Sequence, residues 1–234
     1  MRGDIDVAAA AALLSEPARA ELVLGVMERG ALPATELASR AGVAPSTASE
    51  HLGRLVESGF LRRCKSGRHQ YYGLADVAVA EAVEALSRVA PTRPVRSLRE
   101  ATRSELIRQA RTCYDHLAGR LGVELARVLE RRGVLVSDAG AYVLGPNAKT
   151  SLAGLGIDVG DLARQRRPLV RACLDWSERE PHLAGALGAA ITARLFELGW
   201  IERRDSSRSV AVTAKGRKLL RAEFGLAVEG QTTS

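Results

Sequence analysis

The feature that most constrains this chain is the order of elements predicted between Pro17 and Leu74. Apolar spacing and turn residues predict, in order, a helix over 17–29, a short helix over 35–40, a helix over 46–58, and strands over 60–64 and 69–74. A tight turn at Gly42 separates the short helix from the next one, and Ser66-Gly67 joins the strands. Two helices joined by a tight turn and followed by a hairpin strongly restrict the topology.

The helix predicted over 46–58, which Ser46 could cap, carries small polar residues in its first half and an arginine one turn further on. These residues are Ser46, Thr47, Ser49, Glu50, His51 and Arg54. A helix is narrow enough to enter the major groove of DNA, where the edges of the bases can be distinguished. The element order and this polar surface together predict a winged helix-turn-helix domain that binds DNA sequence-specifically.

The predicted hairpin over 60–74 forms the wing of this domain and is basic. Its basic side chains are Arg62, Arg63, Lys65, Arg68 and His69. Cations on a wing can neutralise phosphates, which positions the protein on the duplex without reading its sequence. The net charge of +7 favours the same polyanionic partner, although an Arg-rich composition by itself can produce such a charge.

Residues 5 to 90 resemble the arsenic-repressor (ArsR/SmtB) family of transcriptional regulators. The similar segments are Leu14-Ser15-Glu16-Pro17-Ala18-Arg19, Glu36-Leu37-Ala38, Ser46-Thr47-Ala48-Ser49-Glu50-His51-Leu52, Leu55-Val56-Glu57-Ser58-Gly59-Phe60-Leu61 and Lys65-Ser66-Gly67-Arg68-His69-Gln70-Tyr71-Tyr72. The resemblance implies a homodimer held by the first helix and the helix at 76–90, which binds a double-stranded operator with two-fold symmetry. The apolar stripe at Val79, Val83 and Leu86 suits either that dimer or packing within the chain.

The usual metal sites of the family have no counterpart in this sequence. Members that sense metals carry a Cys-x-Cys pair in the short helix before the turn, whereas residues 35–40 contain no cysteine. Other members carry histidine and carboxylate ligands on the dimer helix, and residues 76–90 contain no histidine. The cofactor is therefore unknown at this point, and a metal ion or a small-molecule effector both remain open.

A domain boundary is predicted after residue 90, where prolines and arginines indicate a solvated linker over 91–104. The linker residues concerned are Pro91, Arg93, Pro94, Arg96, Arg99 and Arg103. A DNA-binding and dimerisation domain over 1–90 would then precede a regulatory domain over 105–234.

The second domain contains an internal repeat, with copies at about 113–160 and 173–225. Each copy has a Cys-x-Asp element and a His-Leu-Ala-Gly element, then an apolar helix, a hairpin and a closing helix. The predicted fold class is mainly α with small β-hairpins (α+β). It comprises an N-terminal winged helix-turn-helix domain and a C-terminal duplicated helix–hairpin domain that is winged-helix-like.

The repeated elements also hold the candidate effector or metal site. The side chains concerned are Cys113, Tyr114, Asp115, His116, Cys173, Asp175, Trp176 and His182. Two cysteines and two histidines offer two thiolates and two imidazoles, a set that tetrahedral zinc accepts. The spacing of three predicts Cys113 and His116 on one face of a helix.

Three other interpretations of these residues stay open. The cysteines could form a redox switch, or the aromatic rings of Tyr114, Trp176 and Trp200 could line an apolar pocket. Buried cysteines also act as small hydrophobic residues, in which case Asp115 and Asp175 would only cap helices.

Several function classes are disfavoured. Three scattered cysteines do not form a secreted disulfide framework, the first residues lack a basic signal-peptide region, and there is no apolar run of about 18 residues that could span a membrane. A cytoplasmic protein is expected. No phosphate loop, G-x-S-x-G or H-E-x-x-H motif indicates an enzyme, and Cys113 and His116 on one helical face would suit a hydrolase poorly.

The favoured hypothesis is a dimeric repressor or other transcriptional regulator whose second domain senses a small effector or stabilises the dimer. The alternative is a metal- or small-ligand-binding protein whose winged helices mediate protein contacts, because a fold does not determine a function.

Overall fold

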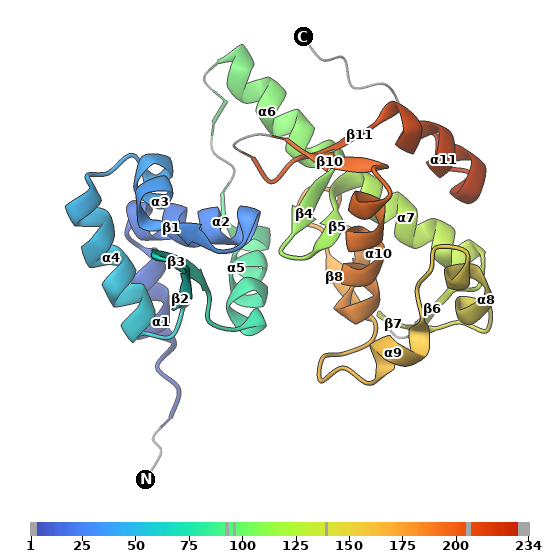
Figure 1. The fold of residues 1–234 in the computed structure, drawn as a ribbon, viewed down its shortest axis with the longest axis horizontal. Helices are drawn as coiled ribbons and strands as arrows, with labels where there is room; N and C mark the ends of the chain where they lie inside the picture. Colours follow the sequence, from blue (N-terminus) through green and yellow to red (C-terminus); the bar gives the residue numbers. More distant parts are fainter. Residues whose placement is uncertain (1–3, 92–93, 96, 139, 205–206, 229–234) are drawn as a thin grey trace. The chain divides into compact units, whose positions relative to one another are not determined.

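The computed structural model describes residues 4–91, 94–95, 97–138, 140–204 and 207–228. Arg93 and Arg96 of the predicted linker lie outside these residues. The chain divides into two units, Met1–Val89 and Ala90–Ser234 (Figure 1). Both are built mainly of helices with small antiparallel β-sheets, which confirms the predicted fold class. Among the described residues, no helix is both long and apolar enough to cross a membrane.

The first unit has the helices and the wing of a winged helix-turn-helix domain. Its elements are α1 (Val7–Leu14), α2 (Pro17–Arg29), β1 (Leu32–Pro33), α3 (Ala34–Ala41), α4 (Pro45–Glu57), β2 (Leu61–Ser66), β3 (His69–Leu74) and α5 (Val77–Val89). The three strands form one antiparallel sheet in the order β1-β3-β2. Leu22, Leu37 and Leu52 are fully buried, so α2, α3 and α4 share a core that holds α4 in place.

The turn between α3 and α4 depends on Gly42. Its φ of 65° lies in the left-handed region, and its N–H donates to the carbonyls of Ala38 and Ser39. Glycine adopts this conformation without a Cβ penalty, so α3 can end sharply before α4 begins. The predicted cap at Ser46 is wrong, because Pro45 occupies the first helical position and Ala44 is the cap.

The second unit contains the repeated order of hairpin, helix, hairpin and helix, preceded by α6 (Leu98–Gln109). The first copy consists of β4 (Arg111–Cys113), β5 (His116–Ala118), α7 (Gly119–Arg131), β6 (Leu135–Asp138), β7 (Ala141–Leu144) and α8 (Ala148–Ala153). Then, after α9 (Val159–Ala163), the second copy consists of β8 (Arg171–Leu174), β9 (Pro181–Ala184), α10 (Gly185–Glu197), β10 (Ile201–Arg203), β11 (Val210–Val212) and α11 (Ala214–Phe224).

The two copies share one hydrophobic core. Buried side chains of α7, such as Leu125 and Leu129, belong to the same cluster as Leu187, Ile191 and other residues of α10. The helix α7 packs against β9 of the other copy, and α10 packs against β5. Each copy therefore covers the hairpin of the other, and neither would bury its apolar surface alone.

The helix α6 begins inside the segment that the sequence predicted to be a linker. The Ser97 hydroxyl accepts a hydrogen bond from the Glu100 N–H, at 3.2 Å, and caps the helix. No described residue of α6 is buried. From Leu98 on, the segment is helical because no proline occurs between Pro94 and the end of α6 and a capping serine precedes good helix formers.

Candidate nucleic-acid interface and buried cysteine–histidine cluster

The outer surface of α4 consists of short polar side chains. Ala48, Leu52 and Leu55 are fully buried on its inner face. The side chains of Ser46, Thr47, Ser49 and Glu50 are exposed on the other face, and His51 is half-buried. Because α4 is held by its buried inner face, its polar outer face can enter a groove of DNA without disturbing the core of the first unit.

Arg54 lies one turn beyond the first polar residues of α4. Its guanidinium group is 2.8 Å from the Glu50 carboxylate, and both side chains are more than half exposed. Exposed ion pairs of this kind contribute little to stability. The Arg54 side chain can therefore leave Glu50 for a base or a phosphate at little cost.

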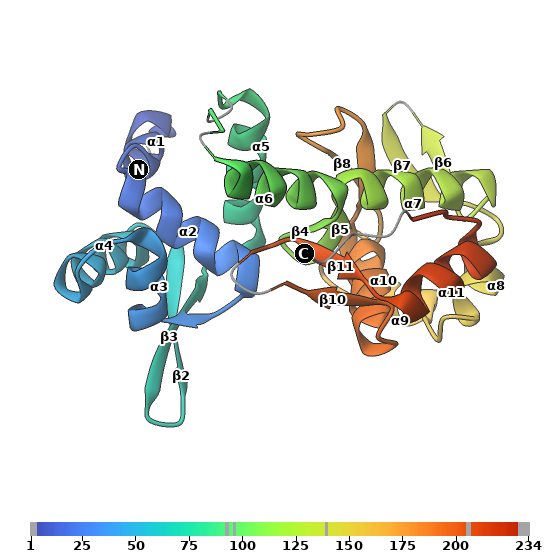
Figure 2. The ribbon, with the colours of Figure 1, turned by 90° about the horizontal axis from the view of Figure 1, so that it is seen from above.

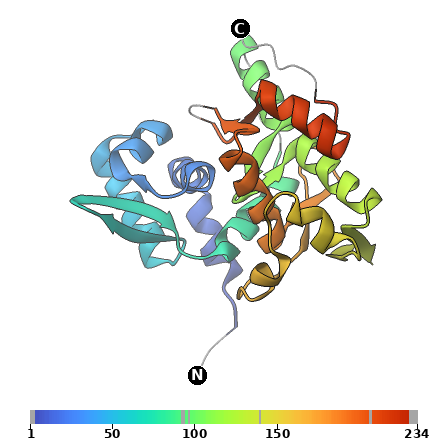
Figure 3. The same ribbon diagram turned by 45° about the vertical axis from the view of Figure 1, so that its right-hand side comes forward.

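The strands β2 and β3 form a long hairpin that projects from the helices of the first unit (Figures 2 and 3). Its tip is a two-residue turn at Gly67 and Arg68, between the paired residues Ser66 and His69. Gly67 has a φ of 59°, which suits glycine in a tight hairpin turn.

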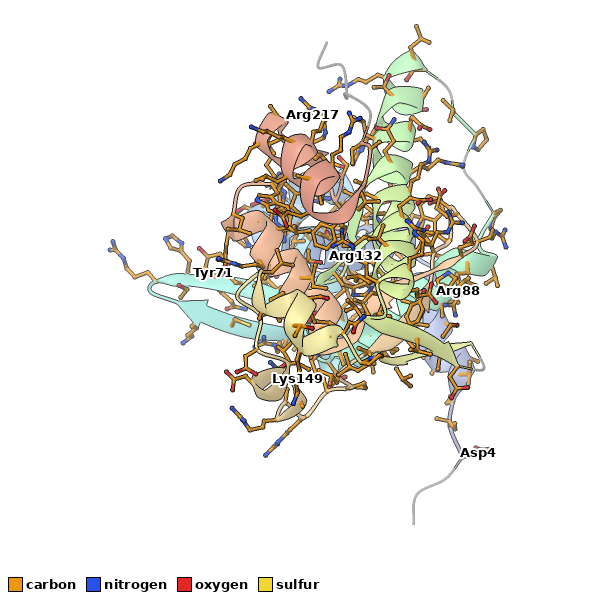
Figure 4. All side chains as sticks on the ribbon, turned by 90° about the vertical axis from the view of Figure 1, so that its right-hand side faces the viewer. Asp4, Tyr71, Arg88, Arg132, Lys149 and Arg217 are labelled. Carbon is orange, nitrogen blue, oxygen red and sulfur yellow. The ribbon has the colours of Figure 1, made fainter. Side chains whose placement is uncertain are left out.

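The basic residues of the wing do not all point into solvent in the same way. Arg63, Lys65, Arg68 and His69 are exposed, and nitrogen-tipped side chains extend from the far end of the hairpin that carries Tyr71 (Figure 4). Arg62 is exposed as well, but it donates through Nε to the Leu74 carbonyl at 3.0 Å. The residues at the tip are therefore better placed to contact phosphates than Arg62 at the base.

The second unit brings two cysteines and two histidines together in its interior. Cys113 pairs with His116 across the β4–β5 hairpin, and Cys173 pairs with His182 across β8–β9. Because β5 and β9 pack together, the two pairs meet. One ligand atom of each of the four residues lies within 4.8 Å of the others, and all four residues are buried.

The sulfur and ring geometry of this cluster is compact. The Sγ atoms of Cys113 and Cys173 are 3.9 Å apart, so no disulfide joins them. The imidazole rings of His116 and His182 have centroids 5.1 Å apart. We refer to Cys113, His116, Cys173 and His182 as the Cys–His cluster.

A carboxylate lies close to the Nδ1 atom of each histidine of the cluster. The Nδ1 of His116 is 3.2 Å from Asp115 Oδ1 and forms a hydrogen bond. The Nδ1 of His182 is 3.3 Å from Asp175 Oδ2, although the geometry is not that of a hydrogen bond. The Nε2 atoms of both rings are buried without a hydrogen-bond partner in the described part of the chain.

Asp175 also connects the two repeats. Its carboxylate accepts hydrogen bonds from Arg111 Nη2 at 2.8 Å and from the N–H of Gly119, the first residue of α7, at 2.7 Å. The side chains of Arg111 and Asp175 are fully buried. Burial opposes ionisation of Asp175, but the charge and hydrogen bonds of Arg111 outweigh it and hold the pKa of the carboxyl well below its ordinary value.

Two members of the cluster, Cys173 and His116, are shifted towards their charged forms. Contact with the Cys113 thiol and with both histidines outweighs burial and sets the pKa of Cys173 far below that of an ordinary thiol. Burial alone would lower the pKa of His116, yet its interactions with Asp115 and with the neighbouring Cys173 raise it. A buried thiolate beside imidazoles is a set of side chains that can bind a soft or borderline metal cation.

Comparison with known proteins identifies the class of this molecule. A helix-turn-helix domain model matches residues 14–64, which cover α2 to α4 and part of the wing. The "uncharacterized HTH-type transcriptional regulator YdfF" of Bacillus subtilis (strain 168) is 40% identical over 212 residues, which are 91% of this chain and 94% of that protein. The chain belongs to the HTH-type transcriptional regulators.

Solved structures are similar to this regulator over a smaller part of its length. The transcriptional repressor BigR from Xylella fastidiosa is 31% identical, with 37% of this chain and 88% of that chain covered and a TM-score of 0.34. The cadmium metal-sensor CMTR from Mycobacterium tuberculosis is 26% identical, with 39% and 99% covered and a TM-score of 0.32.

The structure of the regulator places the sequence-predicted cysteines and histidines together but corrects how they meet. The prediction that Cys113 and His116 share a helical face is wrong, because they oppose each other on β4 and β5. Tyr114, in the turn between these strands, has a φ of 56° that no helix accommodates, and α7 begins only at Gly119. Asp175 does bind the first N–H of α7, but it does so from the other repeat.

The three aromatic residues predicted to line one pocket lie in different surroundings. Trp200 is in the hydrophobic core, with its ring centroid 6.3 Å from that of Phe224. The Trp176 ring lies against the Arg111 guanidinium, 4.7 Å from its centroid. Tyr114 occupies the turn of the first hairpin.

Sequence reasoning missed two contributions to the cluster. The first is Arg111, and the signal that could have found it is the Arg-x-Cys-x-Asp pattern that occurs in both copies of the repeat. Gly122 and Gly188 were read only as part of the repeat. A Cβ on Gly188 would lie 2.5 Å from the Leu183 carbonyl oxygen and 3.3 Å from the Cβ of His116, so glycine permits the close approach of α10 to β9 and β5.

Proposed function

We propose that this regulator is a dimeric repressor of the arsenic-repressor (ArsR/SmtB) type. Its α4 helices would enter successive major grooves of a palindromic operator, and its wings would contact the flanking phosphates. The second unit would sense an effector or stabilise the dimer, so that the role requires no catalytic step. Such a protein would act in the cytoplasm, where a bacterial-type operator is accessible.

The observation that carries DNA binding is the combination of an exposed polar face on α4 with a basic wing tip. The roles are divided between them. Ser49 and Arg54, exposed on α4, would discriminate base pairs, whereas Arg68 and Lys65, exposed on the wing, would neutralise phosphates. A polar helix face that is separate from the basic wing favours sequence-specific binding, because binding by charge alone would need only the wing.

The homodimer is supported by apolar side chains that the chain itself leaves exposed. All eight residues of α1 are Val, Ala or Leu, and none is buried. On α5, Leu86 is 47% and Val89 is 80% exposed. An isolated helix as short as α1 is marginal in water, so an apolar partner is expected to cover it. A second copy offers the same apolar faces in return.

A gel-shift experiment with duplex DNA from upstream of the regulator's own coding region tests the proposed function. Folded, dimeric protein is expected to retard this duplex at moderate salt and not a scrambled duplex of the same composition. Ser49→Ala and Arg54→Ala should change the preferred base at a defined position of each half-site, since good base contacts contribute about 1–3 kcal/mol of discrimination. Equal retardation of both duplexes would overturn sequence-specific recognition.

The dimer has its own test in sedimentation equilibrium. Leu86→Asp should shift the protein towards monomer, because a charge would be buried in the proposed interface. Val143→Asp on β7 is the matched control, since Val143 is 43% exposed but lies in the second unit. Monomeric wild-type protein, or equal effects of both substitutions, would remove α5 from the interface.

A further inference from the structure

We propose that Cys113, His116, Cys173 and His182 bind one zinc ion in a closed tetrahedral site that clamps the two repeats of the second unit together. This inference concerns the second unit alone and does not rest on DNA binding or on the dimer. The residues lie outside the positions at which the resemblance to arsenic repressors would place a metal.

The first argument is the convergence of residue types. The chain has three cysteines and four histidines, and two of each meet in this one site. Each hairpin supplies one cysteine and one histidine at directly paired positions. Because the two hairpins are copies of one another, the site is a pair of equivalent half-sites. Neither half-site by itself has enough ligands for a structural zinc ion, which takes four.

The second argument is the distance between the ligand atoms. Two sulfur ligands, each about 2.3 Å from one zinc ion at a tetrahedral angle, lie about 3.8 Å apart. The Sγ atoms of Cys113 and Cys173 are 3.9 Å apart. All four ligand atoms lie within 4.8 Å of one another. An ion can therefore be accommodated among them with small side-chain adjustments and without moving the hairpins.

The third argument is the state of the imidazole nitrogens. Each Nδ1 faces a carboxylate, that of Asp115 at 3.2 Å or that of Asp175 at 3.3 Å. Metal-bound histidines commonly direct their second nitrogen at a carboxylate, which orients the ring. The remaining Nε2 atoms of His116 and His182 are buried and have no hydrogen-bond partner in the described chain. A buried imidazole nitrogen without a partner is costly, and metal coordination would satisfy both.

The chemistry of the ligands selects the class of metal. Thiolate and imidazole ligands suit zinc and disfavour magnesium and calcium, which prefer oxygen. Four protein ligands, all buried, leave no open position for water or substrate, as in structural zinc sites. Packing of cysteines as small hydrophobic residues accounts for the thiols, but it leaves the two Nε2 atoms unexplained. A disulfide accounts for neither nitrogen.

Metal content of untagged wild-type protein is the first measurement, because a histidine tag would bind metal itself. Protein purified without added metal or chelator should contain about one zinc ion per chain, as measured by inductively coupled plasma mass spectrometry. Cys113→Ser and Cys173→Ser should each abolish this stoichiometric zinc. Cys64→Ser in the wing and His69→Gln at its tip are the matched controls and should retain it.

Spectroscopy of the wild-type protein covers the case in which the substituted proteins fail to fold. Cobalt-loaded protein should show the intense visible bands of tetrahedral Co(II) and a thiolate charge-transfer band. X-ray absorption at the zinc edge should give two sulfur and two nitrogen neighbours. Removal of zinc by a chelator should lower the midpoint of thermal unfolding observed by tryptophan fluorescence, since both tryptophans lie in the second unit.

Three results would overturn the zinc site. Wild-type protein that remains metal-free after incubation with equimolar zinc has no such site. A Cys113–Cys173 disulfide in freshly isolated protein would assign the thiols to redox chemistry instead. Retention of one zinc by the folded Cys113→Ser, Cys173→Ser double variant would place the metal elsewhere. None of these results bears on operator binding, so the two proposals fail independently.

Discussion

The two units of this regulator differ in where they hold their polar side chains. In the first unit, the polar face of α4 and the tip of the wing are exposed and follow one another within a single motif. In the second unit, the Cys–His cluster, Arg111 and Asp175 are buried and come from hairpins about sixty residues apart. Exposed groups can be replaced without disturbing the fold, whereas buried groups depend on one another.

The largest effect that this comparison predicts is on stability, at Asp175. Asp175→Asn leaves the buried Arg111 guanidinium without a counter-charge, and breaking such a pair costs about 3–5 kcal/mol. Urea unfolding of the second unit, followed by tryptophan fluorescence with a chelator present, measures the change without any contribution from metal.

Asp161→Asn is the control for that prediction. Asp161 of α9 pairs with Arg164, the residue that follows this helix. Both side chains are more than half exposed, so loss of the pair should cost below about 1 kcal/mol. Equal destabilisation by the two substitutions would contradict the distinction between the buried and exposed pairs.

A smaller loss of stability is expected where α10 approaches the hairpins. Gly188→Ala introduces a Cβ only 2.5 Å from the Leu183 carbonyl oxygen, and overpacking of this kind costs about 1–3 kcal/mol. Gly53→Ala on α4 meets nothing within 4 Å and removes a glycine from a helix interior, so it should stabilise the first unit by about 0.5–1 kcal/mol. Thermal unfolding by circular dichroism measures both changes in stability. A Gly188→Ala protein as stable as wild type would show that α10 can move away from β9 without cost.

The smallest predicted effect is a difference in DNA affinity between substitutions at the tip and at the base of the wing. Arg68→Ala should weaken binding to every duplex. It should also reduce the slope of the logarithm of the binding constant against the logarithm of the salt concentration by about 1, because one phosphate contact is lost. Arg62→Ala should change this slope less, since the Arg62 guanidinium is held by the Leu74 carbonyl. Fluorescence anisotropy at several salt concentrations measures both slopes, and an equal reduction would show that Arg62 also reaches the backbone of DNA.

Local patterns were sufficient to predict most elements of both units. The apolar spacing predicted α2, α3 and α4 to within a few residues, and the Ser66-Gly67 turn predicted the wing. The repeat predicted the hairpins that follow α7 and α10. The sequence misled at Cys113 and His116, because a spacing of three suits one face of a helix as well as the two ends of a tight hairpin turn. In the structure, Tyr114 and Asp115 form that two-residue turn.

The sequence by itself determined the polar outer face of α4 and the positive charge of the wing. Both depend on residues close together in one helix or one hairpin. It also identified the four members of the Cys–His cluster by residue type. Only the tertiary structure decided that they meet, since this depends on the pairing registers of two hairpins and on the packing of β5 against β9. Contacts that join distant segments arise from the shared core of the two repeats, and no local pattern encodes that core.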